Sequence, residues 1–278
     1  MKLFQKAVLV LAAFLLTTNV HATKRNEASV KLTNNINLLF IGNSITAGAT
    51  LSNASTQAPP IVCGQLVQEA TGVTTNVYNG GHSGITTLGF LPGRADFTKV
   101  VNAGKAFKGN GGPIIFSIML GTNDSACTTT EGAPVSPDTY KNNIKKIIDG
   151  LIEAVPDCKI LLNYPIWYSP NTYNSAKYLQ EGLDRLHSYY PLIDEIVAEY
   201  DQVYAGNRGV WEYFKDNKVL FTEENGRAGK FYLHPNANGA KCLAEIWAKS
   251  LLGIIQKNKG RGYHRKHRKH RANTQHHI

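Results

Sequence analysis

Four short polar stretches of the chain hold side chains that together could carry out acyl transfer. They are Gly42-Asn43-Ser44-Ile45-Thr46, residues 79–86, Gly121-Thr122-Asn123-Asp124 and Leu233-His234-Pro235-Asn236. A serine hydroxyl can attack an acyl carbon, and a nearby histidine can remove its proton. Backbone N–H groups of a glycine-rich turn and the amide of an asparagine can stabilise the negative charge that develops on the acyl oxygen. The four stretches therefore supply the groups that a serine hydrolase requires.

His234 is the histidine that the sequence favours as the base. Of the nine histidines, six lie near the two ends of the chain and three lie in its body: His82, His187 and His234. His187 falls in a polar predicted helix, and His82 lies two residues before Gly84, where its side chain could contact a substrate. His234 lies just before a predicted helix, so its loop can bring the imidazole within hydrogen-bond reach of Ser44.

Strands and helices alternate along the chain and position these stretches. Apolar strands are predicted at 38–41, 73–78, 114–120, 159–163 and 202–204, and helices at 59–72, 137–155, 175–200 and 236–254. Ser136-Pro137 provides an N-cap followed by a first-turn proline, and apolar residues recur at helical spacing from Ile144 to Val155. The alternation predicts a three-layer α/β/α sandwich with a central parallel five-stranded sheet. Ligands of such sheets bind at the carboxyl ends of the strands, where Ser44 and Asn123 occur.

In this order and spacing, the four stretches resemble the conserved blocks of the SGNH (GDSL-type) hydrolases, over about residues 37–254. The resemblance implies a flavodoxin-like fold, with Ser44 as nucleophile and His234 as base. It also implies that the oxyanion is bound by the N–H groups of Ser44 and Gly84 and by the Asn123 amide. No cofactor and no metal are expected, because the domain has neither a phosphate-binding glycine loop nor a cluster of metal ligands at the usual spacing.

Two positions depart from the family pattern. Asn43 stands where the family usually has aspartate, and an amide can keep much of the same turn hydrogen bonding. Phe231 stands three residues before His234, where the family has the aspartate that orients the histidine. Either a main-chain carbonyl or a relocated carboxylate must do this, and the nearest carboxylates belong to Asp216, Glu223 and Glu224. We slightly favour a Ser–His dyad supported by a carbonyl.

The resemblance further implies an esterase that removes short acyl groups, above all acetyl, from carbohydrates. Aromatic residues follow the fourth predicted strand, where they could stack on sugar rings: Tyr164, Trp167, Tyr168, Tyr173 and Tyr178. We expect Trp167, Tyr168 and His82 to contact the substrate. The sequence has no apolar lid or cap that would suggest a channel for a long acyl chain.

Two other functions remain open from the sequence. A lysophospholipase or acyl-thioesterase of the same family would hydrolyse long acyl chains faster than short ones. A non-catalytic glycan-binding protein on a degenerate hydrolase scaffold would account for the missing aspartate, although binding alone requires no oxyanion donors.

The N-terminal end of the chain has a composition unlike its body. Residues 1–22 are typical of a secretory signal peptide, with Lys2 and Lys6, an apolar run, and a small-residue cleavage site at Val20-His21-Ala22. Residues 23–36 would then form an N-terminal segment and residues 37–256 the hydrolase domain. We expect the protein to be secreted or periplasmic.

Eight of the ten charges in the net charge of +10 lie in the C-terminal segment, because residues 257–278 contain eight cations and no acidic residue, and Lys2 and Lys6 supply the other two. The body without this segment and the signal peptide carries twenty cations and twenty acidic residues. We expect the segment to be disordered, since like charges repel and nothing apolar can be buried. It is either a solvated extension, which we favour, a contact for a polyanionic glycan or surface, or a weak metal-binding tract. Nucleic acid is not an expected partner, because interleaved aromatic residues are lacking.

The four cysteines are Cys63, Cys127, Cys158 and Cys242. They allow two disulfides in an oxidising compartment, with three possible connectivities. Buried free thiols fit the sequence equally well, and no pair has the Cys-x-x-Cys spacing of a zinc or redox motif.

Overall fold

The computed structural model describes residues 35–128 and 131–273, and side chains only as far as residue 256. The predicted signal peptide, residues 1–22, lies outside the described residues, as does most of the segment 23–36. In the part of the chain that is described, no helix is at once long and apolar enough to span a bilayer. Export remains a prediction, because the predicted signal peptide lies outside the described residues.

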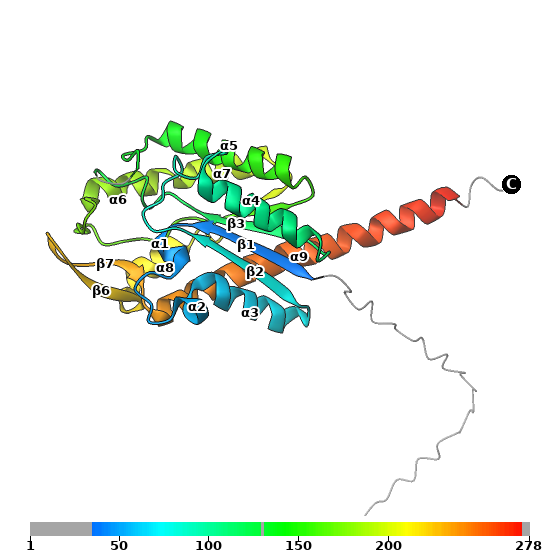
Figure 1. Ribbon diagram of the computed structural model, residues 1–278, viewed down its shortest axis with the longest axis horizontal. Coiled ribbons are helices and arrows are strands. Elements are labelled where there is room, and N and C mark those ends of the chain that lie inside the picture. Colours follow the sequence, from blue (N-terminus) through cyan, green and yellow to red (C-terminus); the bar gives the residue numbers. More distant parts are fainter. Residues whose placement is uncertain (1–34, 129–130, 274–278) are drawn as a thin grey trace, which may run out of the picture. The chain divides into compact units, whose positions relative to one another are not determined.

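A parallel five-stranded sheet forms the centre of the fold (Figure 1). Its strands are β1 (Ile36–Gly42), β2 (Thr75–Gly81), β3 (Ile114–Met119), β4 (Lys159–Leu162) and β5 (Val203–Ala205). They lie in the order β2-β1-β3-β4-β5, and every neighbouring pair is parallel. Strands β1 and β3 are buried along their whole length, which explains their near-continuous apolar sequences.

Helices cover both faces of this sheet (Figure 1). Helices α3 (Pro59–Thr71) and α9 (Ala237–Asn273) pack together on one face, and α4 (Ala95–Lys108), α5 (Pro137–Ala154) and α7 (Tyr190–Glu199) cover the other. Shorter helices are α1 (Ser44–Ala47), α2 (Ala54–Gln57), α6 (Leu179–Ser188), α8 (Val210–Asp216) and a 3-10 turn at Lys218–Leu220. The fold confirms the predicted three-layer α/β/α sandwich.

The helix-end signals in the sequence act as expected. The Ser136 hydroxyl accepts a hydrogen bond from the Thr139 N–H at the start of α5, and Pro137 opens the helix. Gly72 ends α3 in the left-handed conformation.

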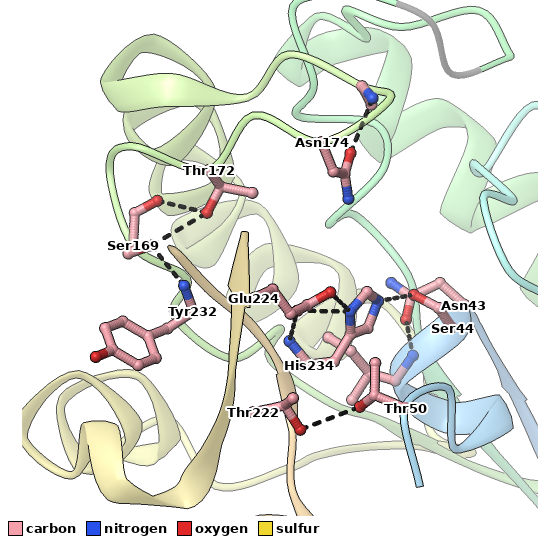
Figure 2. Close-up of polar contacts among 12 residues, drawn as sticks. Asn43, Ser44, Thr50, Ser169, Thr172, Asn174, Thr222, Glu224, Tyr232 and His234 are labelled. Atoms are coloured by element: carbon pink, nitrogen blue, oxygen red, sulfur yellow. Dashed lines mark hydrogen bonds and ion pairs between the residues drawn. The ribbon is translucent and has the colours of Figure 1, made fainter. Parts of the chain in front are cut away.

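A hairpin outside the main sheet is one of the elements that sequence analysis missed, as are helices α2, α4 and α8. Strand β6 (Phe221–Gly226) pairs antiparallel with β7 (Gly229–Pro235). The hairpin is fastened to the long loop after β4, because the Ser169 N–H donates to the Tyr232 carbonyl at 2.9 Å and the Tyr232 N–H donates to the Ser169 hydroxyl at 2.8 Å (Figure 2). A third bond joins the Arg227 N–H to the Tyr173 carbonyl. These bonds fix the hairpin to that loop.

Helix α9 is longer than predicted. It continues through Asn273, beyond the expected end at Ile254 and into the basic segment for which we expected no regular structure. Extending an existing helix requires no new nucleus, which is the costly step in helix formation. The backbone thus differs from the expectation of disorder, and contact with a polyanion stays a prediction.

All four cysteines lie in the described part of the chain, and each is a free thiol. The structure therefore contains no disulfide between them. Burial raises the pKa of the Cys158 thiol to about 12 and that of Cys63 even further. Both are protonated at neutral pH and act as small apolar side chains in the core.

Candidate active site

Ser44 begins helix α1 directly after strand β1. The Asn43 side chain caps this turn, because its Oδ1 accepts the Ile45 N–H at 3.0 Å. The amide therefore forms the turn hydrogen bond that we expected it to keep in place of aspartate. Gly42 is required at the end of the strand, since a Cβ there would lie 2.0 Å from the Thr46 hydroxyl. The tight turn leaves the half-buried Ser44 at the carboxyl edge of the sheet.

His234 meets Ser44 from the end of the β6–β7 hairpin. Its Nε2 lies 2.9 Å from the Ser44 hydroxyl oxygen, and its side chain is largely buried. The two residues are 190 positions apart in sequence. This distance is within the range that proton transfer from a serine to a histidine requires.

Glu224 orients the His234 imidazole, which corrects the carbonyl-supported dyad that we favoured. The Glu224 carboxylate oxygens lie 2.9 and 3.1 Å from His234 Nδ1, and one of them also accepts the His234 backbone N–H at 3.2 Å. A carboxylate on Nδ1 requires the proton there, so Nε2 presents its lone pair to Ser44. Figure 2 shows the three side chains in a row.

The hairpin register explains how Glu224 replaces the missing aspartate. Phe231, at the usual aspartate position, pairs directly with Glu224 on the neighbouring strand. The carboxylate thus lies on the strand opposite the usual aspartate position, and it still contacts the imidazole of His234. Of the other two sequence candidates, Glu223 is exposed and forms an ion pair with Lys230, and Asp216 borders a different cavity.

Gly84 and Asn123 come from the loops after β2 and β3. Gly84 has φ +80°, a conformation that favours glycine, although a Cβ there would have open space. Asn123 is buried; its Nδ2 donates to the Ile85 carbonyl at 2.9 Å, and its Oδ1 accepts the Tyr178 hydroxyl at 2.7 Å. Asn123 therefore ties the glycine-rich turn to the loop that follows β4.

The neighbouring Asp124 strengthens this connection. Its carboxylate accepts hydrogen bonds from both the N–H and the hydroxyl of Thr87. Complete burial raises the pKa of Asp124 to about 6, although the bonds from Thr87 act in the opposite direction. The two loops that carry Gly84 and Asn123 are thus held against each other by buried polar contacts.

One pocket of about 440 Å³ joins these residues. Ser44, Gly84, Asn123 and His234 all line it, together with the predicted substrate residue His82. The remaining lining residues are Ala49, Ser83, Ile85, Gly89, Asp96, Glu131, Asn174, Ser175, Ala176, Tyr178 and Leu233. Five of the residues that sequence analysis did not single out have polar side chains: Ser83, Asp96, Glu131, Asn174 and Ser175.

Trp167 and Tyr168 do not line this pocket, so the expectation that they contact the substrate is corrected. Tyr168 is completely buried, and its hydroxyl lies 3.0 Å from the Ser125 hydroxyl. Trp167 is 5% exposed, packs edge-on against Phe221, and borders a separate cavity. The loop after β4 turns both rings inward, where Trp167 packs against Phe221 of the hairpin and Tyr168 packs against Tyr178.

His82 is exposed at the rim of the pocket. Its Nδ1 lies 2.5 Å from an Asp96 carboxylate oxygen, and Lys99 contacts the other oxygen at 3.0 Å. Partial burial acts to raise the pKa of Asp96, but the hydrogen bonds from His82 and Lys99 outweigh it and lower the pKa. Among the described side chains, no group of three or more His, Cys, Asp or Glu residues is arranged to hold a metal ion.

The fold and the site together are those of a hydrolase built on a parallel α/β sheet. The chain belongs to the GDSL-like lipase/acylhydrolase family, whose model matches residues 40–242 and thus more than half of the sequence. This membership confirms the resemblance that the four polar stretches indicated. No curated protein matches the sequence.

Several solved structures share the fold. A variant of the acetylxylan esterase Axe2 from Geobacillus stearothermophilus is 21% identical, with TM-score 0.56, over 79% of this chain and 95% of that chain. A carbohydrate esterase family 3 protein from Talaromyces cellulolyticus is 16% identical, with TM-score 0.53, over 80% and 99%. A lipase/acylhydrolase from Enterococcus faecalis is 17% identical, with TM-score 0.52, over 79% and 96%. At these identities the likeness establishes the fold alone.

Proposed function

We propose that the protein is an exported serine esterase that cleaves short acyl esters, above all acetyl esters, of carbohydrates. Ser44 Oγ attacks the acyl carbon while His234 Nε2 takes its proton, giving a tetrahedral intermediate. The imidazolium then protonates the leaving alcohol, and an acyl ester remains on Ser44. Water attacks this ester with His234 again as base, which releases the carboxylic acid and restores the serine.

The observation that carries this proposal is the continuous chain of hydrogen bonds from Glu224 through His234 to Ser44. Both bonds are about 2.9 Å long, and the chain ends in a pocket. Glu224 stabilises the imidazolium that forms when Ser44 attacks. The N–H groups of Ser44 and Gly84 and the Asn123 amide serve as oxyanion donors in the proposal, and all three residues border the pocket.

The lining of the pocket supports a small acyl group and a polar alcohol. Its apolar side chains are few and small or medium in size: Ala49, Ile85, Ala176 and Leu233. Hydrogen-bonding side chains make up much of the remainder, including His82, Asn174 and Ser175. Sugar hydroxyls need such partners, whereas a long acyl chain needs a continuous apolar channel. The printed names of two similar structures, an acetylxylan esterase and a carbohydrate esterase, point the same way.

The test of the proposed function is hydrolysis of p-nitrophenyl acetate, butyrate and octanoate by the protein without residues 1–22. We expect kcat/KM to fall at least about tenfold from acetate to octanoate, because one or two methylenes that find no apolar surface already change binding by this much. Faster hydrolysis of octanoate would instead indicate a lysophospholipase or thioesterase. If none of the three esters is hydrolysed, the glycan-binding alternative replaces the esterase.

His82 tests the carbohydrate part of the proposal. We expect His82→Ala to lower kcat/KM for an acetylated xylooligosaccharide about tenfold and to leave p-nitrophenyl acetate hydrolysis unchanged. The reason is that a hydrogen bond to a sugar hydroxyl contributes about 1 kcal/mol, and p-nitrophenyl acetate has no free hydroxyl group. His187→Ala is the matched control, because His187 borders the other cavity. Equal losses on both substrates would contradict a contact between His82 and the sugar.

A further inference from the structure

Tyr178 is a buried residue of the active-site pocket to which the mechanism above assigns no role. It lies at the end of the loop after β4, and only 3% of it is exposed. Its hydroxyl is 2.7 Å from Asn123 Oδ1, and it lines the same pocket as Ser44 and His234. A tyrosine hydroxyl therefore contacts a proposed oxyanion donor directly from the side of the amide oxygen.

The two hydrogen bonds of the Asn123 amide determine which way it points. The Ile85 carbonyl can only accept, so the amide nitrogen must face it at 2.9 Å. The amide oxygen then faces Tyr178, whose hydroxyl must be the donor. Burial raises the pKa of Tyr178 well above its usual value, so this hydroxyl carries its proton at neutral pH.

The backbone around Tyr178 is fixed to the segment that follows Asn123. The Cys127 N–H donates to the Lys177 carbonyl at 2.6 Å, and the Cys127 thiol lies 3.2 Å from the Tyr178 carbonyl. Thr128 and Lys177 form an antiparallel bridge beside these bonds. These contacts fix the backbone at Tyr178 to the segment that carries Asn123.

We propose that Tyr178 is a positioning residue for the oxyanion hole, which holds the Asn123 amide with its nitrogen directed away from the Tyr178 hydroxyl and toward the reacting ester. Donation to Oδ1 also polarises the amide and makes its N–H groups stronger donors. Without the hydroxyl, only the bond from Nδ2 to the Ile85 carbonyl still orients the amide, so the amide is held less firmly and its N–H groups are weaker donors to the oxyanion. The inference rests on the proposed role of Asn123 in acyl transfer.

Tyr168 provides a matched control for this inference. It is also buried, and its ring centroid lies 5.3 Å from that of Tyr178. Its hydroxyl contacts Ser125 at 3.0 Å and not Asn123. Changing either tyrosine to phenylalanine removes one buried hydroxyl from the same cluster, but only Tyr178→Phe removes the partner of the Asn123 amide.

The experiment compares Tyr178→Phe, Tyr168→Phe, Asn123→Ala and the double variant Tyr178→Phe/Asn123→Ala in p-nitrophenyl acetate hydrolysis. We expect Tyr178→Phe to lower kcat about tenfold with KM within about twofold, since a whole oxyanion donor is worth about 10²–10³ in kcat and Tyr178 acts on one donor indirectly. Tyr168→Phe should keep kcat within about twofold of the wild type. Once Asn123 is alanine, Tyr178→Phe should cause no further loss. Thermal unfolding of each variant verifies that it is folded.

Three results would overturn the inference while the wild type remains an active esterase. Equal losses of kcat in the two phenylalanine variants would show a packing effect. A raised KM with unchanged kcat would make Tyr178 a substrate contact. A further tenfold loss in the Asn123→Ala background would show that Tyr178 acts independently of the amide. If the wild type and Tyr168→Phe both lack activity, the proposed function itself fails and the role of Tyr178 falls with it.

Discussion

Replacement of Ser44 by alanine is expected to reduce kcat for p-nitrophenyl acetate by about 10⁶-fold, which is effectively the background rate. The variant loses the nucleophile that lies 2.9 Å from His234 Nε2, and the pocket keeps its other side chains. Stability should change by less than about 1 kcal/mol, because the substitution removes one oxygen from a half-buried site. Initial rates and thermal unfolding of the purified variant measure the two effects.

Ser83→Ala is the control for this experiment. Ser83 lines the same pocket, beside Gly84, but it is exposed, and the hydrogen bond to His234 comes from Ser44. We expect its kcat to stay within about threefold of the wild type, as for a surface substitution. A Ser44→Ala variant that retained even one per cent of wild-type turnover would rule out Ser44 as the nucleophile.

The positions of Ser44 and Asn123 could be predicted because each lies within four residues of the end of a buried strand. A run such as Ile114–Met119 is apolar on both faces, so its end is visible in the sequence, and parallel strands bring their carboxyl ends to one edge. His234 could be predicted by elimination, since only three histidines lie in the body of the chain. For Ser44 and Asn123 the residue type near a strand end indicated the position, and the family resemblance supplied the expected roles of all three residues.

The β6–β7 hairpin and its role could not be predicted in the same way. Its first strand is Phe-Thr-Glu-Glu-Asn-Gly, in which only one residue is apolar, so it gives no strand signal. Without the hairpin there is no register, and without the register Glu223, Glu224 and Asp216 are equivalent candidates. The pairing of Glu224 with Phe231 is the information that sequence spacing lacks.

The direction of side chains in the loop after β4 was also beyond sequence reasoning. Irregular backbone has no period, so the spacing of Trp167, Tyr168 and Tyr178 says nothing about which ring faces the pocket. The structure buries all three, and of the three Tyr178 alone lines the pocket. Composition correctly placed aromatic residues near the site, but it could not assign them individually.

The hairpin places the acid and the base of the site on a single element. Glu224 lies on β6 and His234 on β7, so their contact depends on local strand pairing and not on the packing of distant elements. The Thr222 and Thr50 hydroxyls, 3.3 Å apart, also connect β6 to the loop after α1 (Figure 2). Within this triad, the contact between Ser44 and His234 is therefore the one that joins elements far apart in the sequence.

Glu223 and Glu224 are adjacent on β6, so the effects of replacing each one can be compared directly. We expect Glu224→Gln to lower kcat for p-nitrophenyl acetate about 10³–10⁴-fold, because an uncharged amide neither stabilises the imidazolium nor enforces a proton on Nδ1. KM should change little, since Glu224 does not line the pocket. Glu223→Gln breaks an exposed ion pair with Lys230, which contributes at most about 1 kcal/mol to stability, and affects a long hydrogen bond of 3.4 Å from the Tyr232 hydroxyl. It should keep kcat within about twofold.

The pair of variants also decides between the two ways of orienting His234. If Glu224→Gln kept near-wild-type turnover, the carboxylate would be dispensable, and a carbonyl-supported dyad would have to account for catalysis. If both variants lost activity equally, the common cause would be a distorted hairpin, and the change would also appear as a lower unfolding temperature. If only Glu224→Gln loses turnover, and its unfolding temperature is unchanged, then Glu224 is the residue that orients His234. The third member of the triad would then lie on β6, opposite Phe231.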